Sequence, residues 1–467
     1  MTSASLSNET SVFAPSALLP EGWAEDVLFD LSSEGDIDAV HRGVASSAIP
    51  PGVQRCKGPV VPGMPNLHSH AFQRAMAGLA ERSGPSDDSF WTWRQVMYGF
   101  VGSLTPDQAG AIAGQLYVEM LKAGYTAVGE FHYLHHGPDG LPYDDLAEMS
   151  RQVMGAAKRT GLGITHLPVL YGFGGFGGQT AGEGQRRFLN DPDRFLKLLE
   201  ILFADAAGDP QAAIGIAPHS LRAVTPETLQ AAVEGLAGFN PQAPIHIHIS
   251  EQIKEVEDCL AWSGRRPVDW LYDNIDVDRR WCLIHATHMT EEETGRLASS
   301  GAVAGICPTT EANLGDGLFP ARDFLAQNGT WGIGSDSHIS ISPVEELRWF
   351  EYGQRLAHRR RNLLGSEGED QSVGAGLYRS ALAGGAQALG RKIGRLEGGC
   401  RADLVVLDAE APCLLGKNGD VLLDAMVFAG NVNPVRDVMV GGQWLVQEGR
   451  HRDEEALLLA FRSALEL

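Results

Sequence analysis

The sequence is short of basic residues, and this shortage limits its partners. Lys and Arg together number 37 against 59 Asp and Glu, so the formal net charge at pH 7 is −22. A charge of this sign opposes binding to nucleic acid or to an anionic membrane, so we expect small-molecule partners and neither nucleic acid nor membrane. An anionic small molecule would need arginines placed close to it, because the chain as a whole repels it.

Long apolar runs and paired cysteines are missing as well. The longest apolar runs have the length of strands, which predicts no transmembrane span. The first ten residues, MTSASLSNET, lack the basic and apolar regions of a signal peptide. The six cysteines show no Cys-x-x-Cys spacing and stand at positions 56, 259, 282, 307, 400 and 413. Together these absences predict a cytoplasmic protein with reduced, buried thiols.

What the sequence does contain is a regular alternation of short apolar runs and helical segments. Eight buried parallel strands would close a barrel, and eight runs between about residues 58 and 340 have the character of such strands. They cover residues 58–70, 125–133, 164–172, 212–220, 243–251, 280–288, 301–308 and 330–338.

The segments between these runs carry helix-start signals. Thr105 is a predicted N-cap, with Pro106 in the first turn, Gln108 completing a capping box and Gly124 ending the helix. Similar signals stand at 290–293 and 342–345. The repeated strand–helix order predicts a (β/α)8 TIM-like barrel of the α/β class. An open, doubly wound sheet is the alternative, but no glycine-rich phosphate-binding sequence follows the first strand.

The two ends of the chain differ from this pattern. Both contain short β-prone pieces broken by turn residues, and neither end can bury a core by itself. We therefore expect residues 1–57 and 396–467 to pair into one small β-sandwich domain, with residues 58–395 forming the barrel.

Polar residues gather where the predicted strands end. His68 and His70 are two residues apart on a strand, so they share one face at a separation of about 6.5–7 Å. In such barrels the chemistry takes place at the carboxyl ends of the strands. The strand ends here carry His68, His70, His132, Tyr133, His219, His248, His285 and Asp336.

Four of these residues are predicted to hold a metal ion. His68, His70, His248 and Asp336 provide three imidazoles and a carboxylate, a set that suits one divalent ion, most simply zinc, with a position left open for water. Strands two to five contain no lysine that could bridge two ions, which favours a single one. Glu251 follows His248 closely enough to move a proton without binding the metal.

Three other histidines are interpreted differently. His246 lies one pleat deeper than His248, so it is predicted to face the barrel interior without binding the metal. His135 and His136 follow the second strand in a loop, where we expect them to be solvated or to support other residues.

The motifs together resemble the amidohydrolase superfamily, in its branch of mononuclear deaminases. The resemblance covers nearly the whole chain and is carried by PNLHSHAFQRAMAG, FHYLHH, APHSLRAV, HIHISEQ, HATHM and GSDSHIS. Within this branch, FQRAMAG and PHSLRAV are most similar to the members that act on N-formimino-L-glutamate. The resemblance therefore implies metal-dependent hydrolysis of this compound to N-formyl-L-glutamate and ammonia, a step of histidine degradation.

The resemblance also implies roles for individual residues. Glu251, His285 and Asp336 would be catalytic. A dianionic substrate would be bound by Gln73, Arg94, Tyr133, His219 and Arg222. Arginine forks suit carboxylates, although Arg222 could instead be an intrachain ion-pair partner. We expect a homodimer, with Arg94 acting in its own or in a neighbouring subunit's site.

Three other functions stay open from the sequence. A related deaminase acting on a nucleobase or a triazine-like ring would use the same metal ligands, but it would need a flat aromatic pocket. A catalytically silent scaffold would have been free to lose its ligands. A metal-storage or metal-sensing protein would bind metal without turnover.

Overall fold

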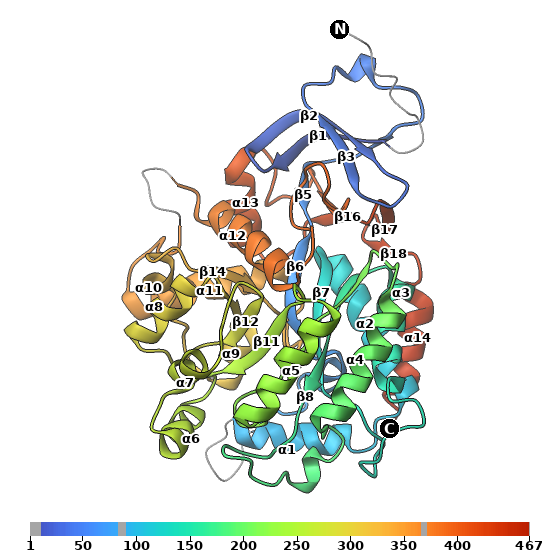
Figure 1. Cartoon of the computed structure of the whole chain (residues 1–467). Helices are drawn as coiled ribbons and strands as arrows, with labels where there is room; N and C mark the ends of the chain where they lie inside the picture. The colour runs from blue at the N-terminus through green and yellow to red at the C-terminus, as the bar shows by residue number, and fades with distance from the viewer. Residues whose placement is uncertain (1–10, 83–89, 366–370, 467) are drawn as a thin grey trace.

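The computed structural model describes residues 11–82, 90–365 and 371–466, and its centre is a barrel of parallel strands (Figure 1). The runs predicted as strands do form the barrel, although the run at 212–220 is divided into two short strands. The barrel strands in chain order are β6 Met64–Ser69, β7 Tyr125–His132, β8 Gly163–Leu170, β9 Ala212–Ile214 with β10 Ala217–Pro218, β11 Ile245–Ile249, β12 Trp281–His285, β13 Val303–Ile306 and β14 Thr330–Ile333.

The barrel closes through a few isolated strand contacts. One sheet has the order β10-β8-β7-β6, with β9 paired to β8, and a second has the order β11-β12-β13-β14. Parallel bridges Ile216–Ile245 and Ser220–His248 join the two sheets on one side. The bridge Ser69–Asp336 joins them on the other side, so the first strand and the segment after the last strand meet beside the predicted metal ligands. The predicted TIM-like barrel is confirmed.

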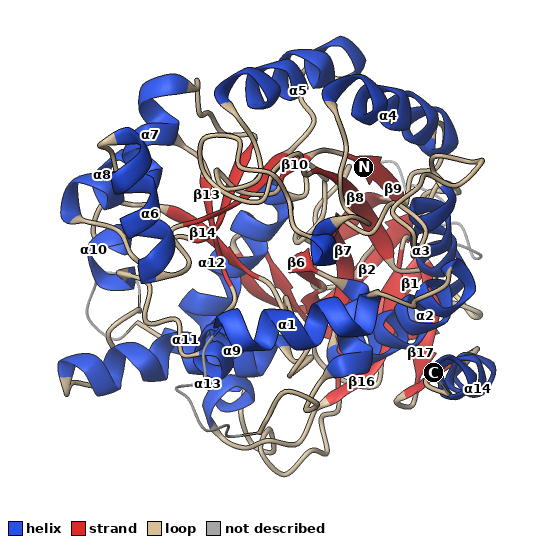
Figure 2. Cartoon of the chain, turned by 90° about the horizontal axis from the view of Figure 1, so that it is seen from below, coloured by secondary structure: helices blue, strands red, loops and turns tan. Residues whose placement is uncertain are grey.

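Helices surround the strands, and α1 passes across one end of the barrel (Figure 2). Helix α2 begins with the predicted capping box of Thr105 and Gln108, and it ends at Gly124 with a φ of 96°. The helices are α1 Phe90–Val101, α2 Pro106–Ala123, α3 Glu148–Thr160, α4 Pro192–Ala206, α5 Pro226–Phe239, α6 Ile253–Ser263, α7 Pro267–Asn274, α8 Glu291–Ser300, α9 Pro308–Leu314, α10 Ala321–Leu325, α11 Pro343–His358, α12 Val373–Ala388, α13 Gly419–Phe428 and α14 Glu454–Ala464, with short 3-10 turns at Ser46–Ala48, Ala71–Met76 and Glu183–Gln185.

The two ends of the chain build a single nine-stranded sheet. Its main path runs β18-β17-β16-β15-β5-β1-β2-β3, with β4 paired to β1. Strand β5 falls inside the range predicted for the barrel, yet it pairs with β1 and β15, and only Gly63 separates it from β6. The strands are β1 Ser11–Leu19, β2 Gly22–Leu31, β3 Ile37–His41, β4 Gln54–Arg55, β5 Val60–Pro62, β15 Leu404–Leu407, β16 Val435–Val440, β17 Gln443–Gln447 and β18 Arg450–His451.

The barrel interior is apolar at the amino ends of its strands and polar at their carboxyl ends. Leu67, Ile284 and Val303 pack against Leu389, which follows α12. This packing fills the floor and leaves the other end for polar side chains. All six cysteines lie in the described ranges and none forms a disulfide. Within those ranges, no helix has both the length and the apolar character that a membrane crossing requires.

Candidate active site

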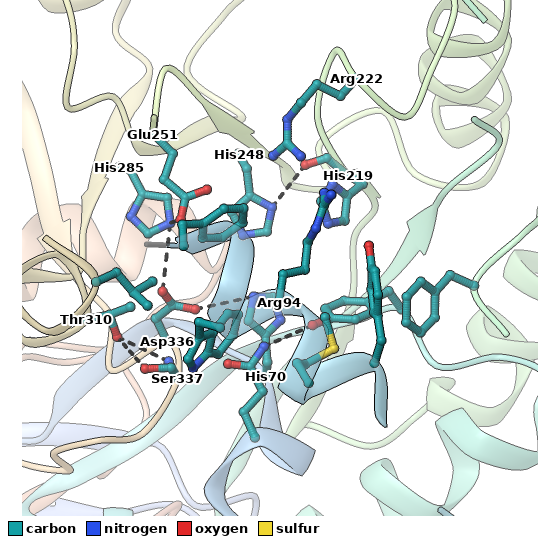
Figure 3. A pocket seen from close by; sticks show the side chains of 18 of the residues that line it. His70, Arg94, His219, Arg222, His248, Glu251, His285, Thr310, Asp336 and Ser337 are labelled. Carbon is teal, nitrogen blue, oxygen red and sulfur yellow. Dashed lines mark hydrogen bonds and ion pairs between the residues drawn. The ribbon is translucent and has the colours of Figure 1, made fainter. Parts of the chain in front are cut away.

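Four predicted metal ligands converge at the carboxyl end of the barrel. The Nε2 atoms of His68 and His248 are 3.0 Å apart. Asp336 Oδ1 lies 3.4 Å from Nε2 of His68 and 3.3 Å from Nε2 of His70. All four side chains are buried. Figure 3 shows three of them around one point at the base of the pocket.

Hydrogen bonds to carbonyl groups orient two of these imidazoles. His70 Nδ1 donates to the carbonyl of Phe131 at 2.9 Å, and His248 Nδ1 donates to the carbonyl of His219 at 3.0 Å. Because a carbonyl only accepts, Nδ1 carries the hydrogen in both rings and Nε2 is left with a lone pair. Burial lowers the pKa of His70 and lowers that of His248 well below the usual range, so both rings are neutral, as metal ligands must be. The donor set therefore fits one divalent ion.

The backbone at these strand ends adopts conformations that non-glycine residues rarely take. His285 has a φ of 67° and Asp336 a φ of 47°. Such residues persist only where their surroundings hold them, and they concentrate at functional sites. Here the Asp336 amide donates to the His68 carbonyl at 3.0 Å, and the Ala286 amide donates to the Ile249 carbonyl at 3.0 Å. The surrounding hydrogen bonds hold these conformations, so the fold sets the direction of the His285 and Asp336 side chains.

Next to the ligands, His285 and Glu251 form an acid–base pair. His285 Nε2 lies 3.6 Å from Glu251 Oε1 and 3.8 Å from Asp336 Oδ2. Burial raises the pKa of Glu251 to about 7. Burial alone would lower the pKa of His285, but the carboxylates around it outweigh that effect and raise the pKa to about 10. Glu251 is therefore able to take up and release a proton near neutral pH.

A pocket opens above this cluster (Figure 3), and all five residues predicted to bind the substrate line it. Gln73 Nε2 donates to the Tyr133 hydroxyl at 2.9 Å, which fixes both side chains at the pocket wall. His219 lines the same wall. The structure thus brings together residues that lie far apart in the sequence.

Two guanidinium groups in this pocket have no carboxylate at ion-pair distance among the described residues. Arg222 is buried, and Arg94 reaches the pocket from α1. Their Cζ atoms lie 6.0 Å and 4.5 Å from the ring centre of Trp91. Among the described residues, neither group forms an ion pair and the Nε atom of each has no hydrogen-bond partner. Burial opposes the charge of Arg222, but the nearby carboxylates of Glu255 and Glu251 raise its pKa, so an intrachain electrostatic role for Arg222 remains the alternative interpretation.

Several histidines lie elsewhere. His132 alternates with Phe131 and Tyr133 on β7, so it faces away from the pocket, and its ring centre lies 5.4 Å from that of His166. His246 faces the barrel floor as predicted, with Nε2 at 2.8 Å from the Ala388 carbonyl. His135 is 3% exposed and bonds the Val169 carbonyl at 2.9 Å.

His136 is likewise 3% exposed and bonds the Leu189 carbonyl at 2.6 Å. Of the two roles expected for His135 and His136, solvation is contradicted, and the bonds to carbonyl groups agree with a supporting role.

The sequence did not reveal some residues of the site. Glu311 lies on α9, after the seventh strand, and its Oε1 is 3.2 Å from His285 Nδ1. Thr310 and Ser337 also line the pocket and share a hydrogen bond of 2.9 Å. The one available signal was the start of a helix directly after β13, because residues in the first turn of such a helix lie near the mouth of the barrel.

Comparisons with known proteins agree with this geometry. The amidohydrolase family model matches residues 60–445, and the model of the N-terminal domain of the formimidoylglutamate deiminase HutF matches residues 9–49. The chain is 56% identical over 458 residues to the formimidoylglutamate deiminase of Pseudomonas aeruginosa, with 98% of this chain and 99% of that protein covered.

Solved structures are similar as well. An amidohydrolase from Brucella melitensis has a TM-score of 0.91 and 51% identity, with 98% of this chain and 99% of that one covered. An adenosine deaminase from Xanthomonas campestris with bound zinc has a TM-score of 0.77 and 23% identity, with 98% and 97% covered, and at that identity it shows the shared fold alone.

Proposed function

The chain belongs to the amidohydrolase family, and from that premise we propose that it hydrolyses the formimino group of N-formimino-L-glutamate, giving N-formyl-L-glutamate and ammonia in histidine degradation. A relative that is 56% identical over almost the full length of both chains is a formimidoylglutamate deiminase. The N-terminal domain that matches the same enzyme extends this likeness beyond the barrel.

The observation that carries the proposal is the pair of arginines without carboxylate partners. Arg222 and Arg94 bring two positive charges to the wall of one pocket in a chain of net charge −22. With no carboxylate at ion-pair distance among the described residues, these guanidinium groups are available to an anionic ligand. N-formimino-L-glutamate carries two carboxylates, which guanidinium groups bind through paired hydrogen bonds. With its carboxylates at the arginines, the substrate directs its formimino group toward the metal ligands.

We propose that His68, His70, His248 and Asp336 hold one divalent ion, with zinc as the expected one. When bound, such an ion supplies an activated water as the nucleophile. The positive charge of His285, which has carboxylates on both sides, favours the negative charge that moves from the C=N bond onto the formimino nitrogen during the attack.

Glu251 is assigned the proton transfers. It accepts a proton from the attacking water, whose oxygen forms a bond to the formimino carbon while the C=N electron pair moves to nitrogen. Glu251 then passes that proton to the nitrogen and afterwards carries the remaining hydroxyl proton the same way. The C–N bond breaks, the carbonyl forms, and the nitrogen leaves as ammonia instead of an amide anion.

The other functions fit the pocket less well. A nucleobase or triazine ring is neutral and would leave Arg94 and Arg222 unpaired beside it. A silent scaffold or a metal-storage protein would not need Glu251 and His285 beside the proposed ligands together with a pocket lined by two arginines.

Ammonia release tests the proposal directly. The purified zinc-loaded protein is assayed with N-formimino-L-glutamate and, in parallel, with a panel of purines, pyrimidines and triazines. We expect turnover with the first compound and none with the panel. Turnover of a ring compound without turnover of formiminoglutamate would overturn the assignment. Metal analysis of the same protein should give about one equivalent of zinc, and two equivalents would contradict the single-ion site.

We further propose that the protein works in the cytoplasm as a homodimer. Six free cysteines support a reducing compartment. Sedimentation analysis tests the dimer, and a mixture of inactive Arg94→Ala and Glu251→Gln chains tests whether Arg94 serves a neighbouring subunit. Activity returns on mixing only if the arginine acts across an interface.

A further inference from the structure

Glu130 is a buried carboxylate that the proposed mechanism does not use. It lies on β7, is 1% exposed and does not line the pocket. One of its oxygens accepts from the Ser69 hydroxyl at 2.6 Å and from the Tyr117 hydroxyl at 3.1 Å, and the other accepts from the Ala71 amide at 2.7 Å. Ser69 precedes the metal ligand His70 and Ala71 follows it. Glu130 therefore holds the chain on both sides of that ligand.

Ser69 also connects Glu130 to the segment that follows the last barrel strand, β14. Ser69 Oγ lies 3.1 Å from His338 Nε2, and His338 Nδ1 lies 3.0 Å from Ser335 Oγ. Asn66 completes a ring, since its Nδ2 donates to Ser335 Oγ at 2.6 Å and its Oδ1 accepts from the Ser335 amide at 3.0 Å. Ser335 and His338 stand on either side of the ligand Asp336. These four residues are fully buried.

The ring spans the junction at which β6 and the segment after β14 close the barrel. Among the described residues one isolated bridge joins them, between Ser69 and Asp336, and Asp336 and His338 both have positive φ values, of 47° and 59°. Strained residues need fixed partners to stay in place. A buried polar network whose members are all paired is rigid, and partners of metal ligands tune metal affinity by orienting those ligands.

We propose that Glu130 is a positioning residue for the metal site: through Ser69 and His338 it holds His70 and Asp336 in their binding geometry before the ion arrives. The inference rests on the metal site proposed above. It assigns Glu130, Ser69, His338, Ser335 and Asn66 to one unit, which we name the closure network. Its loss would weaken metal binding because the ligands would have to be ordered at the moment of binding.

The test measures zinc affinity on full-length apo protein by competition with a chromogenic chelator. Glu130→Gln keeps the shape of the side chain, but an amide nitrogen cannot accept from the hydroxyls of Ser69 and Tyr117. We expect zinc affinity to fall by about 10–100-fold. The matched control is Glu351→Gln, a fully buried carboxylate outside the pocket that accepts from the amides of Leu363 and Leu364, both at 2.9 Å. It should lose stability and keep the affinity of the parent.

Ser69→Ala is a milder second variant that tests the same positioning role. Its zinc affinity can be measured even if Glu130→Gln does not accumulate. It should also weaken zinc binding, and in the double variant the two losses should be less than additive, because both changes break one network.

Parent-like zinc affinity in both single variants, with a lowered melting temperature of the apo protein, would overturn the positioning role and leave the metal site standing. Failure of the parent itself to bind zinc would overturn the metal site, and the closure network with it.

Discussion

The Nδ1 atom of His285 lies 3.2 Å from Oε1 of Glu311, a carboxylate that comes from helix α9 and not from a barrel strand. The same oxygen accepts a hydrogen bond from the Cys307 amide at 2.8 Å, so its position is fixed by the start of the helix. A carboxylate at this place accepts from Nδ1 and leaves Nε2 turned toward Glu251. Glu311 therefore sets which ring nitrogen of His285 points toward Glu251 and the pocket.

Replacing Glu311 by Gln tests this relationship. The amide keeps the shape but removes a negative charge that helps to keep the pKa of His285 high. We expect kcat to fall by about 10–100-fold with KM little changed, because partners of this kind orient a ring without contacting substrate. Steady-state kinetics at saturating metal measure the effect, with the exposed Glu292→Gln on α8 as control. An unchanged kcat would show that His285 needs no such support.

Glu251→Gln removes the proposed proton carrier and keeps its volume. General acid–base catalysis is typically worth ~10²–10⁴-fold, and turnover should fall by that order. Zinc content should stay at the parent level, since Glu251 is not one of the proposed ligands. The exposed Glu257→Gln on α6 is the matched control and should behave as the parent. Nearly normal turnover would mean that another group moves the proton.

The pH dependence follows from the raised pKa of Glu251. Burial raises it to about 7, and the base form is the one that accepts a proton from water. As the pH falls through about 7, Glu251 becomes protonated and kcat/KM should decline, whereas above that value it should level off. The residual activity of Glu251→Gln should not show this decline at low pH. A parent profile that stays flat from about pH 8 to about pH 6 would contradict the assignment.

Arg222→Met tests the charge that selects the substrate. A charge-assisted hydrogen bond contributes ~1.5–3 kcal/mol, and ~1.4 kcal/mol corresponds to tenfold. We therefore expect KM for N-formimino-L-glutamate to rise by tens- to a hundredfold, with zinc content and fold unchanged. Neutral formamidines should be poor substrates of both proteins and show little difference between them. Arg360→Met, at an exposed arginine after α11, controls for loss of surface charge. A parent-like KM would assign Arg222 a structural role.

The barrel and the convergence of the proposed ligands were predictable because both follow from local rules. Strand periodicity places His68 and His70 on one face, and the parallel order of strands brings His248, His285 and Asp336 to the same rim. These rules use only the order of elements along the chain.

What could not be predicted depends on contacts between distant parts of the chain. The apolar run at 58–70 does not show that its first half, β5, pairs with β15 near the other end. Glu311 reaches His285 from a helix, where strand alternation gives no guidance. His132 stands at a strand end but faces outward, because its neighbours Phe131, on β7, and Tyr133, directly after β7, face inward.

The pairing of β5 with both chain ends has a consequence for how the molecule is made. Strands β1 to β5 leave the ribosome early, but β15, which pairs with the free side of β5, begins only at Leu404. During most of synthesis the nascent chain therefore carries an unpaired sheet edge, which is a template for pairing with other chains. Translation that stops before residue 404 leaves that edge of β5 unpaired. We expect such a truncated chain to aggregate more readily than the full-length chain.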